Sequence, residues 1–295
     1  MGKPKKKKLD RLWQAAADPT SPSRFDNLLN LAEYLVYHSA PDEAAAVARE
    51  AVEAASSVSL ADDQGASYLL AVALDNSGRV EEALEEVSKA IARLKEEGNA
   101  EWLALCLWER GTIELKLDQH FAALTSLCEA IDWFEWTGRL DTAAHIALEA
   151  AEIAEDYWDT DNAARLATKA IEHYRELKDY KELIRAMNFM TRLMFNDKQY
   201  ATALGYAEST MALAEYVDNL TMRQDVQLLY GRALIAFGDY SKAIRQLIEV
   251  TKVKDNAEQR ANGELALGYL EDAYTQTGRL EEAAKIAKLR KALGT

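Results

Sequence analysis

Apolar residues recur along the chain with the spacing of amphipathic helices, and small residues recur at a much longer period. One alanine per period forms a series spaced by 39 residues once and by 40 residues five times: Ala44, Ala83, Ala123, Ala163, Ala203, Ala243 and Ala283. A second, mostly small series lies twelve residues before these anchors: Ala32, Ala71, Gly111, Ala151, Thr191, Gly231 and Glu271. Antiparallel helices approach closely only where a side chain is small, so each period predicts one helix hairpin.

The chain therefore predicts an all-α fold, an α-α superhelix (solenoid) of about seven hairpins. Its first helices are expected near 24–38, 62–77, 100–117, 140–157, 180–196, 220–237 and 257–277. A second helix follows each of them, and the last ends near residue 293. No proline follows Pro41, so the strongest helix breaker is absent from the rest of the chain. We expect a single array over 24–295, an N-terminal capping helix and turn over 9–23, and a disordered basic tail over 1–8.

Charge is distributed unevenly along the chain. The formal net charge is -14, but residues 1–11 carry six basic side chains and one acidic one, which leaves -14 - 5 = -19 on the remainder. A net charge this negative on the rest of the chain repels phosphate backbones, and we expect no nucleic-acid partner. The run Lys5–Lys8 could be a nucleic-acid arm or a nuclear address. We prefer a solubilising tail or a vector-derived remnant, because no aromatic residues are interleaved with the lysines.

Two further features bear on the cellular environment. Cys106 and Cys128 lie in apolar helical surroundings and are interpreted as reduced core residues. The chain shows neither an apolar signal core nor a run of the roughly 18 apolar residues that a membrane span needs. We expect a soluble, cytoplasmic protein with no membrane partner.

No pattern of catalytic or metal-binding residues stands out. The four histidines, His38, His120, His145 and His173, lie in different repeats without paired spacing, and the motifs CxxC, GxGxxG and GxxxxGK are absent. We predict no enzyme, no metal site and no cofactor. An enzyme would require several perturbed titratable groups gathered in one pocket.

Three segments resemble the second-helix half of tetratricopeptide repeats: GRVEEALEEVSKAI (78–91), GDYSKAIRQL (238–247) and GRLEEAAKIA (278–287). The resemblance covers roughly residues 24–293. The sequence departs from the family pattern because the first-helix tryptophan and the closing proline are missing, and because the repeat has 40 residues where about 34 is usual. Without the proline, each second helix can run about one turn longer.

The resemblance implies that first helices line a concave groove, with groove-facing side chains 18, 15, 14, 11, 8 and 7 residues before each anchor. Candidate partner-binding residues at these positions are Tyr37, Tyr68, Trp108, Glu149, Glu152, Arg185, Asn188, Arg192, Asn196 and Arg232. The candidates are acidic in the fourth repeat and basic in the fifth and sixth.

Arg185, Asn188 and Arg192 share one helix face, and Arg232 is expected one repeat along from Arg192. Such amides and guanidinium groups could clamp a peptide backbone or carboxylate. Equally, Arg185 and Arg192 could simply pair with Glu149 and Glu152.

These observations favour a scaffold or adaptor that binds a protein or peptide partner in the groove. The alternative is a peptide-responsive sensor or regulator that acts through a partner or through self-association. Exposed ends of repeat arrays can also pair, so a homodimer stays open as an option.

Overall fold

The computed structural model describes residues 3–38, 40–55, 60–97, 99–157, 159–252 and 255–293, and every regular element in them is an α-helix. The first half of the chain forms α1 (Lys3–Ala16), α2 (Arg24–Tyr37), α3 (Pro41–Ala55), α4 (Leu60–Asn76), α5 (Val80–Glu97), α6 (Ala100–Lys116), α7 (His120–Trp136) and α8 (Leu140–Asp156). The second half forms α9 (Thr160–Glu176), α10 (Tyr180–Asn196), α11 (Tyr200–Ala214), α12 (Leu220–Phe237), α13 (Tyr240–Val250), α14 (Ala257–Gln276) and α15 (Leu280–Leu293).

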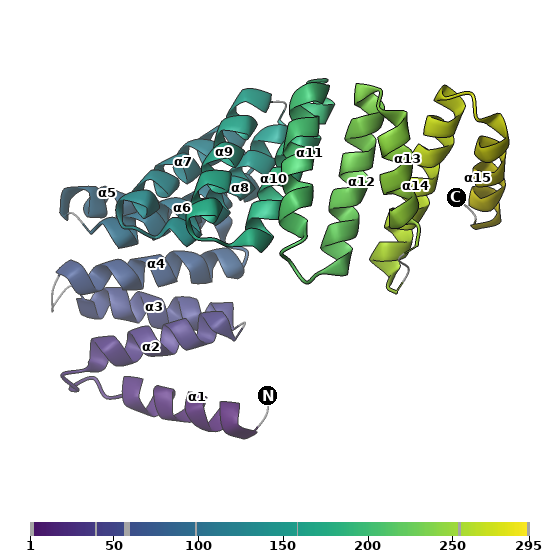
Figure 1. The fold of residues 1–295 in the computed structure, drawn as a ribbon. Helices are drawn as coiled ribbons and strands as arrows, with labels where there is room; N and C mark the ends of the chain where they lie inside the picture. The colour runs from purple at the N-terminus through teal and green to yellow at the C-terminus, as the bar shows by residue number, and fades with distance from the viewer. Residues whose placement is uncertain are drawn as a thin grey trace. The chain divides into compact units, whose positions relative to one another are not determined.

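The predicted all-α hairpin repeat is confirmed. Even-numbered helices from α2 to α14 are the predicted first helices, and odd-numbered helices from α3 to α15 are the second helices (Figure 1). The largest difference at a helix start is at α4, which begins at Leu60 where residue 62 was expected. Periodicity of small and apolar residues thus places the helices to within about one turn.

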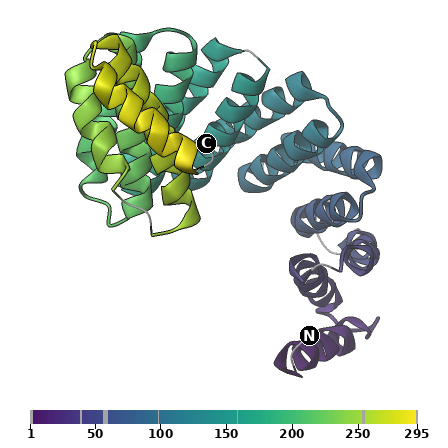
Figure 2. The same ribbon diagram turned by 90° about the vertical axis from the view of Figure 1, so that its right-hand side faces the viewer.

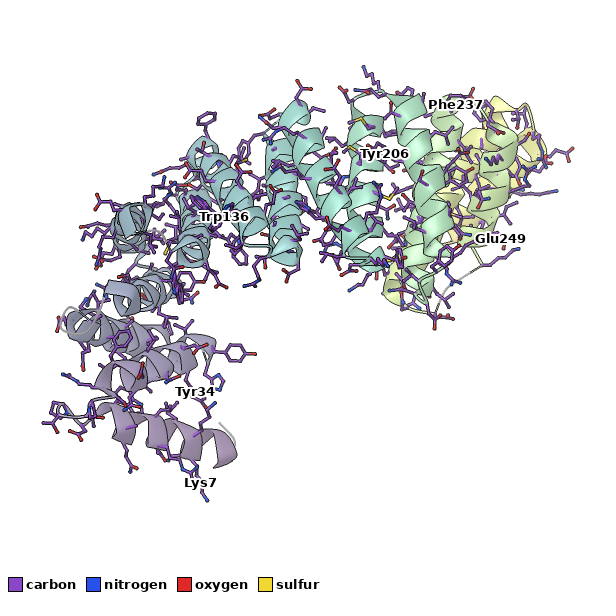
Figure 3. The ribbon with its side chains drawn as sticks, turned by 60° about the vertical axis from the view of Figure 1, so that its left-hand side comes forward. Lys7, Tyr34, Trp136, Tyr206, Phe237 and Glu249 are labelled. Carbon is purple, nitrogen blue, oxygen red and sulfur yellow. The ribbon has the colours of Figure 1, made fainter. Side chains whose placement is uncertain are left out.

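Helix α1 corrects the prediction for the N-terminus. Residues 1 and 2 lie outside the described residues, but α1 begins at Lys3, so the expectation of a disordered tail is wrong for residues 3–8. Lysine is a good helix former, and the helix is held by contacts with α2: Asn27 Nδ2 donates to the carbonyl of Ala15 at 3.1 Å, and Lys8 lies over the Tyr34 ring. Lys7 lies on the side of α1 that faces away from α2 (Figure 3).

The chain divides into two compact units, residues 1–153 and 154–295. Within each unit, helices that follow each other in sequence pack together, from α1 to α7 and from α9 to α15, and first helices also contact each other, as α2 with α4, α4 with α6, α10 with α12 and α12 with α14. In each unit, these contacts between first helices bring side chains of consecutive repeats next to each other. Figure 2 shows the last hairpin, α14 and α15, with its two helices side by side.

The small-residue series occupies the tightest parts of each hairpin. Six of the seven anchor alanines are completely buried, and Ala283 is 7% exposed. At the notch positions, a Cβ added at Gly111 would lie 2.8 Å from Leu127, and one at Gly231 would lie 2.6 Å from Leu247. Both leucines come four residues after the anchor of the same hairpin, so the notch accepts one side chain of the facing helix.

Turns inside the hairpins use left-handed backbone five residues before the anchor. Gly78, Gly238 and Gly278 have φ of 80°, 94° and 73°, while Asp118 and Lys198 adopt φ of 57° and 61°. Glycine adopts this left-handed backbone without strain, because it has no Cβ. At Lys198, where the sequence shows no turn residue, the same geometry is imposed on a lysine, at a cost of about 1 kcal/mol.

Candidate groove on the first helices

Side chains at equivalent positions of consecutive first helices contact each other. In unit 1, Lys116 on α6 forms an ion pair and hydrogen bond with Asp75 on α4, 41 residues earlier. In unit 2, Asn196 on α10 donates to Glu155 at 3.3 Å, again 41 residues earlier. Asp75 and Glu155 both lie eight residues before their anchors, and Lys116 and Asn196 lie seven before theirs. The same register thus recurs in both units.

Glu155 organises the polar cluster of unit 2. Its carboxylate accepts from Arg192 Nη2 at 2.9 Å as well as from Asn196. The Glu155 side chain is 20% exposed and the Arg192 side chain is 47% exposed, so nearly half of the arginine side chain is open to solvent. The Arg192 guanidinium also lies 5.2 Å from the centre of the Phe189 ring, which restricts its orientation.

Arg232 on α12 stacks on the neighbouring repeat. Its guanidinium lies 3.8 Å from the centre of the Phe195 ring on α10, and Phe195 also contacts Tyr200 with ring centroids 5.4 Å apart. Arg192 and Phe195 are on the same helix, so α10 and α12 carry two guanidinium groups, each fixed against an aromatic ring. Stacking leaves the N–H edges of a guanidinium able to donate to a carboxylate or a peptide carbonyl.

The other candidate residues of this region do not bond to Glu155. Arg185 pairs with Glu182 of its own helix at 2.7 Å, and Asn188 is half-buried on α10. Glu149 lies 3.3 Å from His145 on α8, and Glu152 is exposed. The carboxylates that Arg185 and Arg192 bond are Glu182 and Glu155, whereas the alternative interpretation expected Glu149 and Glu152.

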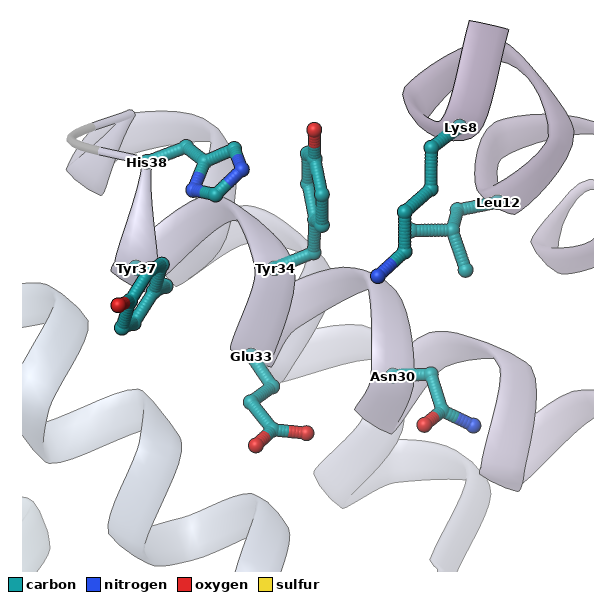
Figure 4. Close-up of a pocket in the computed structure, with 7 residues that line it drawn as sticks. All are labelled: Lys8, Leu12, Asn30, Glu33, Tyr34, Tyr37 and His38. Carbon is teal, nitrogen blue, oxygen red and sulfur yellow. The ribbon is translucent and has the colours of Figure 1, made fainter. Parts of the chain in front are cut away.

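In unit 1, Tyr37 is the most exposed candidate. Its side chain is 84% exposed, and it borders an open pocket of about 530 Å³ between α1 and α2 (Figure 4). The lining consists of Lys8, Leu12, Asn30, Glu33, Tyr34, Tyr37 and His38. Tyr34 stands at the centre of this pocket with the His38 ring tilted against it, centroids 4.0 Å apart.

Tyr68 and Trp108 are less accessible than expected. Tyr68 packs against Trp102 with centroids 5.7 Å apart, and its burial raises the pKa of its hydroxyl. Trp108 lies edge-on to Phe134 and to His145, at 6.4 Å in both cases, and its indole Nε1 is buried without a hydrogen-bond partner. Trp108 therefore contributes an unsatisfied donor beside the groove.

The described residues show little else of a reactive site. They contain no group of three or more His, Cys, Asp or Glu side chains arranged to hold a metal ion. Within the same part of the chain, no helix combines the length and apolarity needed to cross a membrane. Cys106 and Cys128 are free thiols, and burial, with Glu109 adding, raises the pKa of Cys106 to about 12, so that thiol stays protonated.

Comparison with known proteins identifies the fold. No family model matches the sequence, and no curated protein matches it. Among solved structures, the apo form of RapI is similar with a TM-score of 0.66, at 11% identity over 90% of this chain and 75% of that one.

Two further structures are also similar. The first is a signal-transduction ATPase from Pyrococcus horikoshii with a tetratricopeptide-repeat sensor. Its TM-score is 0.66 at 14% identity, over 95% of this chain and 42% of that chain. The second is the kinesin light chain TPR-like repeats from Podosopora anserina, with a TM-score of 0.55 at 16% identity, over 68% of this chain and 99% of that chain.

The chain folds as a tetratricopeptide-type repeat. This agrees with the resemblance drawn from the three second-helix segments. In the third and fourth repeats, the second helices α7 and α9 each have 17 residues and continue past the position where a closing proline would end them, whereas α11 and α13 end before it.

Glu109 was not among the residues predicted from the sequence, although its surroundings are unusual for a carboxylate. Glu109 on α6 is half-buried, its Oε1 is buried without a hydrogen-bond partner, and desolvation together with the Asp75 carboxylate raises its pKa to about 7. Glu109 lies fourteen residues before the anchor Ala123 and Asp75 lies eight before Ala83, so both occupy groove positions. The repeat offsets alone identify these positions, although not their burial.

Proposed function

We propose that this protein is a scaffold or adaptor that binds a protein or peptide segment along the first helices. The observation that supports this most directly is the recurring contact between groove positions 41 residues apart. A surface built from the same positions in successive repeats can follow a partner over several repeats, with charge and aromatic character varying along it. Its side chains recognise rather than react, and we propose no enzymatic activity.

Within unit 2, we propose that Arg192 and Arg232 recognise carboxylate or peptide carbonyl groups of the partner. Each guanidinium is held by an aromatic ring, and Arg192 is also held by Glu155. Less conformational entropy is lost on binding when a donor is already oriented. Asn196 and Asn188 supply amides that can donate to and accept from a backbone.

A double charge reversal tests this proposal. We expect Arg192→Glu with Arg232→Glu to abolish capture of the partner in an affinity pulldown from native lysate followed by mass spectrometry, while circular dichroism shows unchanged helical content. The matched control is Arg165→Glu with Arg245→Glu, which makes the same charge change at exposed positions of second helices and should leave capture intact. Partner capture that survives in the Arg192/Arg232 variant would contradict the proposed site.

A sensor role is the second candidate, because the similar ATPase structure carries its tetratricopeptide repeat as a sensor. In that case the ligand is a short peptide, and its binding alters association with a partner or between copies. A screen of peptides by fluorescence polarisation separates the two functions: a scaffold retains a protein from lysate, whereas a sensor binds a short peptide and changes its association state. If the well-folded protein retains no protein from lysate and binds no short peptide, both the scaffold and the sensor function are excluded.

A further inference from the structure

Helix α13 is shorter than the other second helices of unit 2, and a buried glutamine ends it. It stops at Val250 after 11 residues, whereas α9 has 17 and α11 has 15. Gln224 of α12 is almost completely buried, and its Nε2 donates to the Val250 carbonyl at 2.7 Å. That carbonyl is one that a further helical turn would have bonded, so Gln224 satisfies it in place of the turn.

The start of α14 is fixed by the same group of amides. Gln224 Nε2 also donates to the backbone carbonyl of Gln259 at 3.0 Å, and Gln259 Nε2 donates to Thr221 Oγ1 at 3.1 Å. Asn256 and Gln259 form a reciprocal capping box at the first turn of α14. The short α13 is thus built into the structure, and the space next to its end is preformed.

A pocket of about 220 Å³ opens between α13, α14 and α15, next to the end of α13. Most of its lining is apolar and comes from all three helices: Ile248, Leu267, Leu270, Tyr274, Ile286 and Leu289. Thr251, Arg260 and Glu264 supply the polar part. Gly263 lines the pocket without a side chain, and a Cβ there would have its nearest neighbours at 3.9 Å.

We propose that this pocket binds one compact apolar ring of benzene to indole size, with any polar substituent directed towards Arg260 and Glu264. A cavity of about 150 Å³ lined by Leu, Ile and Phe stays dry and binds benzene, so a similarly lined pocket of this size suits such a ring. Apolar walls with a few polar groups to one side are the usual construction of ligand sites. The ring can belong to a free small molecule or to an aromatic side chain of a partner.

Titration of the full-length protein with indole, followed by NMR of labelled methyl groups, tests the site. We expect saturable shifts at the methyls of Ile248, Leu267 and Ile286, and none at Ile184, which is buried elsewhere in unit 2. No shift up to the solubility of indole, or shifts at other methyls only, would overturn the proposal. The titration uses the wild-type protein, so its result does not depend on whether a variant folds.

Filling the pocket provides the matched comparison. We expect Gly263→Leu to weaken indole binding by about tenfold or more, because the new side chain takes the place of the ring. Gly268→Leu is the control, since Gly268 is on the same helix but lines a different pocket, with Leu265, Tyr269 and Arg290. Unchanged indole affinity in a folded Gly263→Leu variant would sink the assignment.

A second arm distinguishes the source of the ring. The pentapeptides Ala-Ala-Phe-Ala-Ala and Ala-Ala-Ala-Ala-Ala are titrated under the same conditions. Saturable binding of the first peptide alone, lost in Gly263→Leu, supports an aromatic side chain of a partner as the occupant. Binding of indole without either peptide supports a free small molecule instead.

Discussion

Replacing Glu109 by glutamine is expected to stabilise the protein at pH 8 by about 1–3 kcal/mol, with most of this gain gone at pH 5. The side chain is half-buried on α6, and its buried Oε1 has no hydrogen-bond partner. Burial disfavours the charged form most, the nearby Asp75 adds to the effect, and Lys116 opposes it, which together raise the pKa of Glu109 to about 7. Glutamine keeps the shape of the side chain and removes the charge.

The sign of the pH dependence follows from proton binding. Between the ordinary pKa of 4.5 and about 7, the folded protein holds a proton on Glu109 that the unfolded chain has released. The contribution of this group to stability is therefore fully present below about pH 4.5 and falls as the pH rises, until it is lost above about 7. Wild type should lose stability over this range relative to the variant.

Urea unfolding at several pH values between 5 and 8 measures the difference. Glu101→Gln is the matched control, because Glu101 is on the same helix with its side chain 59% exposed, and its replacement should change stability by less than about 0.5 kcal/mol throughout. A difference between wild type and Glu109→Gln that stays constant with pH would show that Glu109 is not titrating in this range.

The sequence predicted the hairpins well because the repeat is set by local packing. Each anchor alanine and each notch glycine lies where two neighbouring helices meet, so the spacing of small residues directly records helix contacts. The prediction of a disordered tail differs from the structure because it rested only on the charge of the lysine run. Leu9 and Leu12 lie on the same helix face as the buried Ala16, and the helix that they anchor extends back to Lys3.

The site was less predictable because it depends on burial and on partner choice. Repeat offsets place Arg192 and Glu155 at groove positions, but whether Arg192 bonds Glu155 or Glu152 depends on rotamers that no spacing encodes. Glu109 is chemically unusual only because its surroundings exclude water. The early end of α13 is imposed by Gln224, which lies 26 residues before Val250 on another helix, and local propensity does not report such a contact.

Gly231→Ala is expected to lower the free energy of unfolding by about 1–2 kcal/mol, although alanine is the better helix former. The added Cβ would lie 2.6 Å from Cγ and Cδ2 of Leu247, which is completely buried. Overpacking of this kind costs about 1–3 kcal/mol, and the gain in helix propensity of about 1 kcal/mol offsets only part of it. Gly111→Ala should behave in the same way against Leu127.

Gly205→Ala is the control with the opposite sign. Gly205 lies on α11 with open space around the position of a Cβ, so alanine should stabilise the protein by about 0.5–1 kcal/mol through helix propensity alone. The contact itself is tested by adding Leu247→Ala to Gly231→Ala, measured by urea unfolding. Leu247→Ala alone removes buried volume and destabilises, but beside Ala at position 231 it removes the clashing Cγ and Cδ2 atoms, so the two changes should couple by about 0.5 kcal/mol or more. If the changes in the free energy of unfolding simply add, the destabilisation by Gly231→Ala does not come from the contact with Leu247.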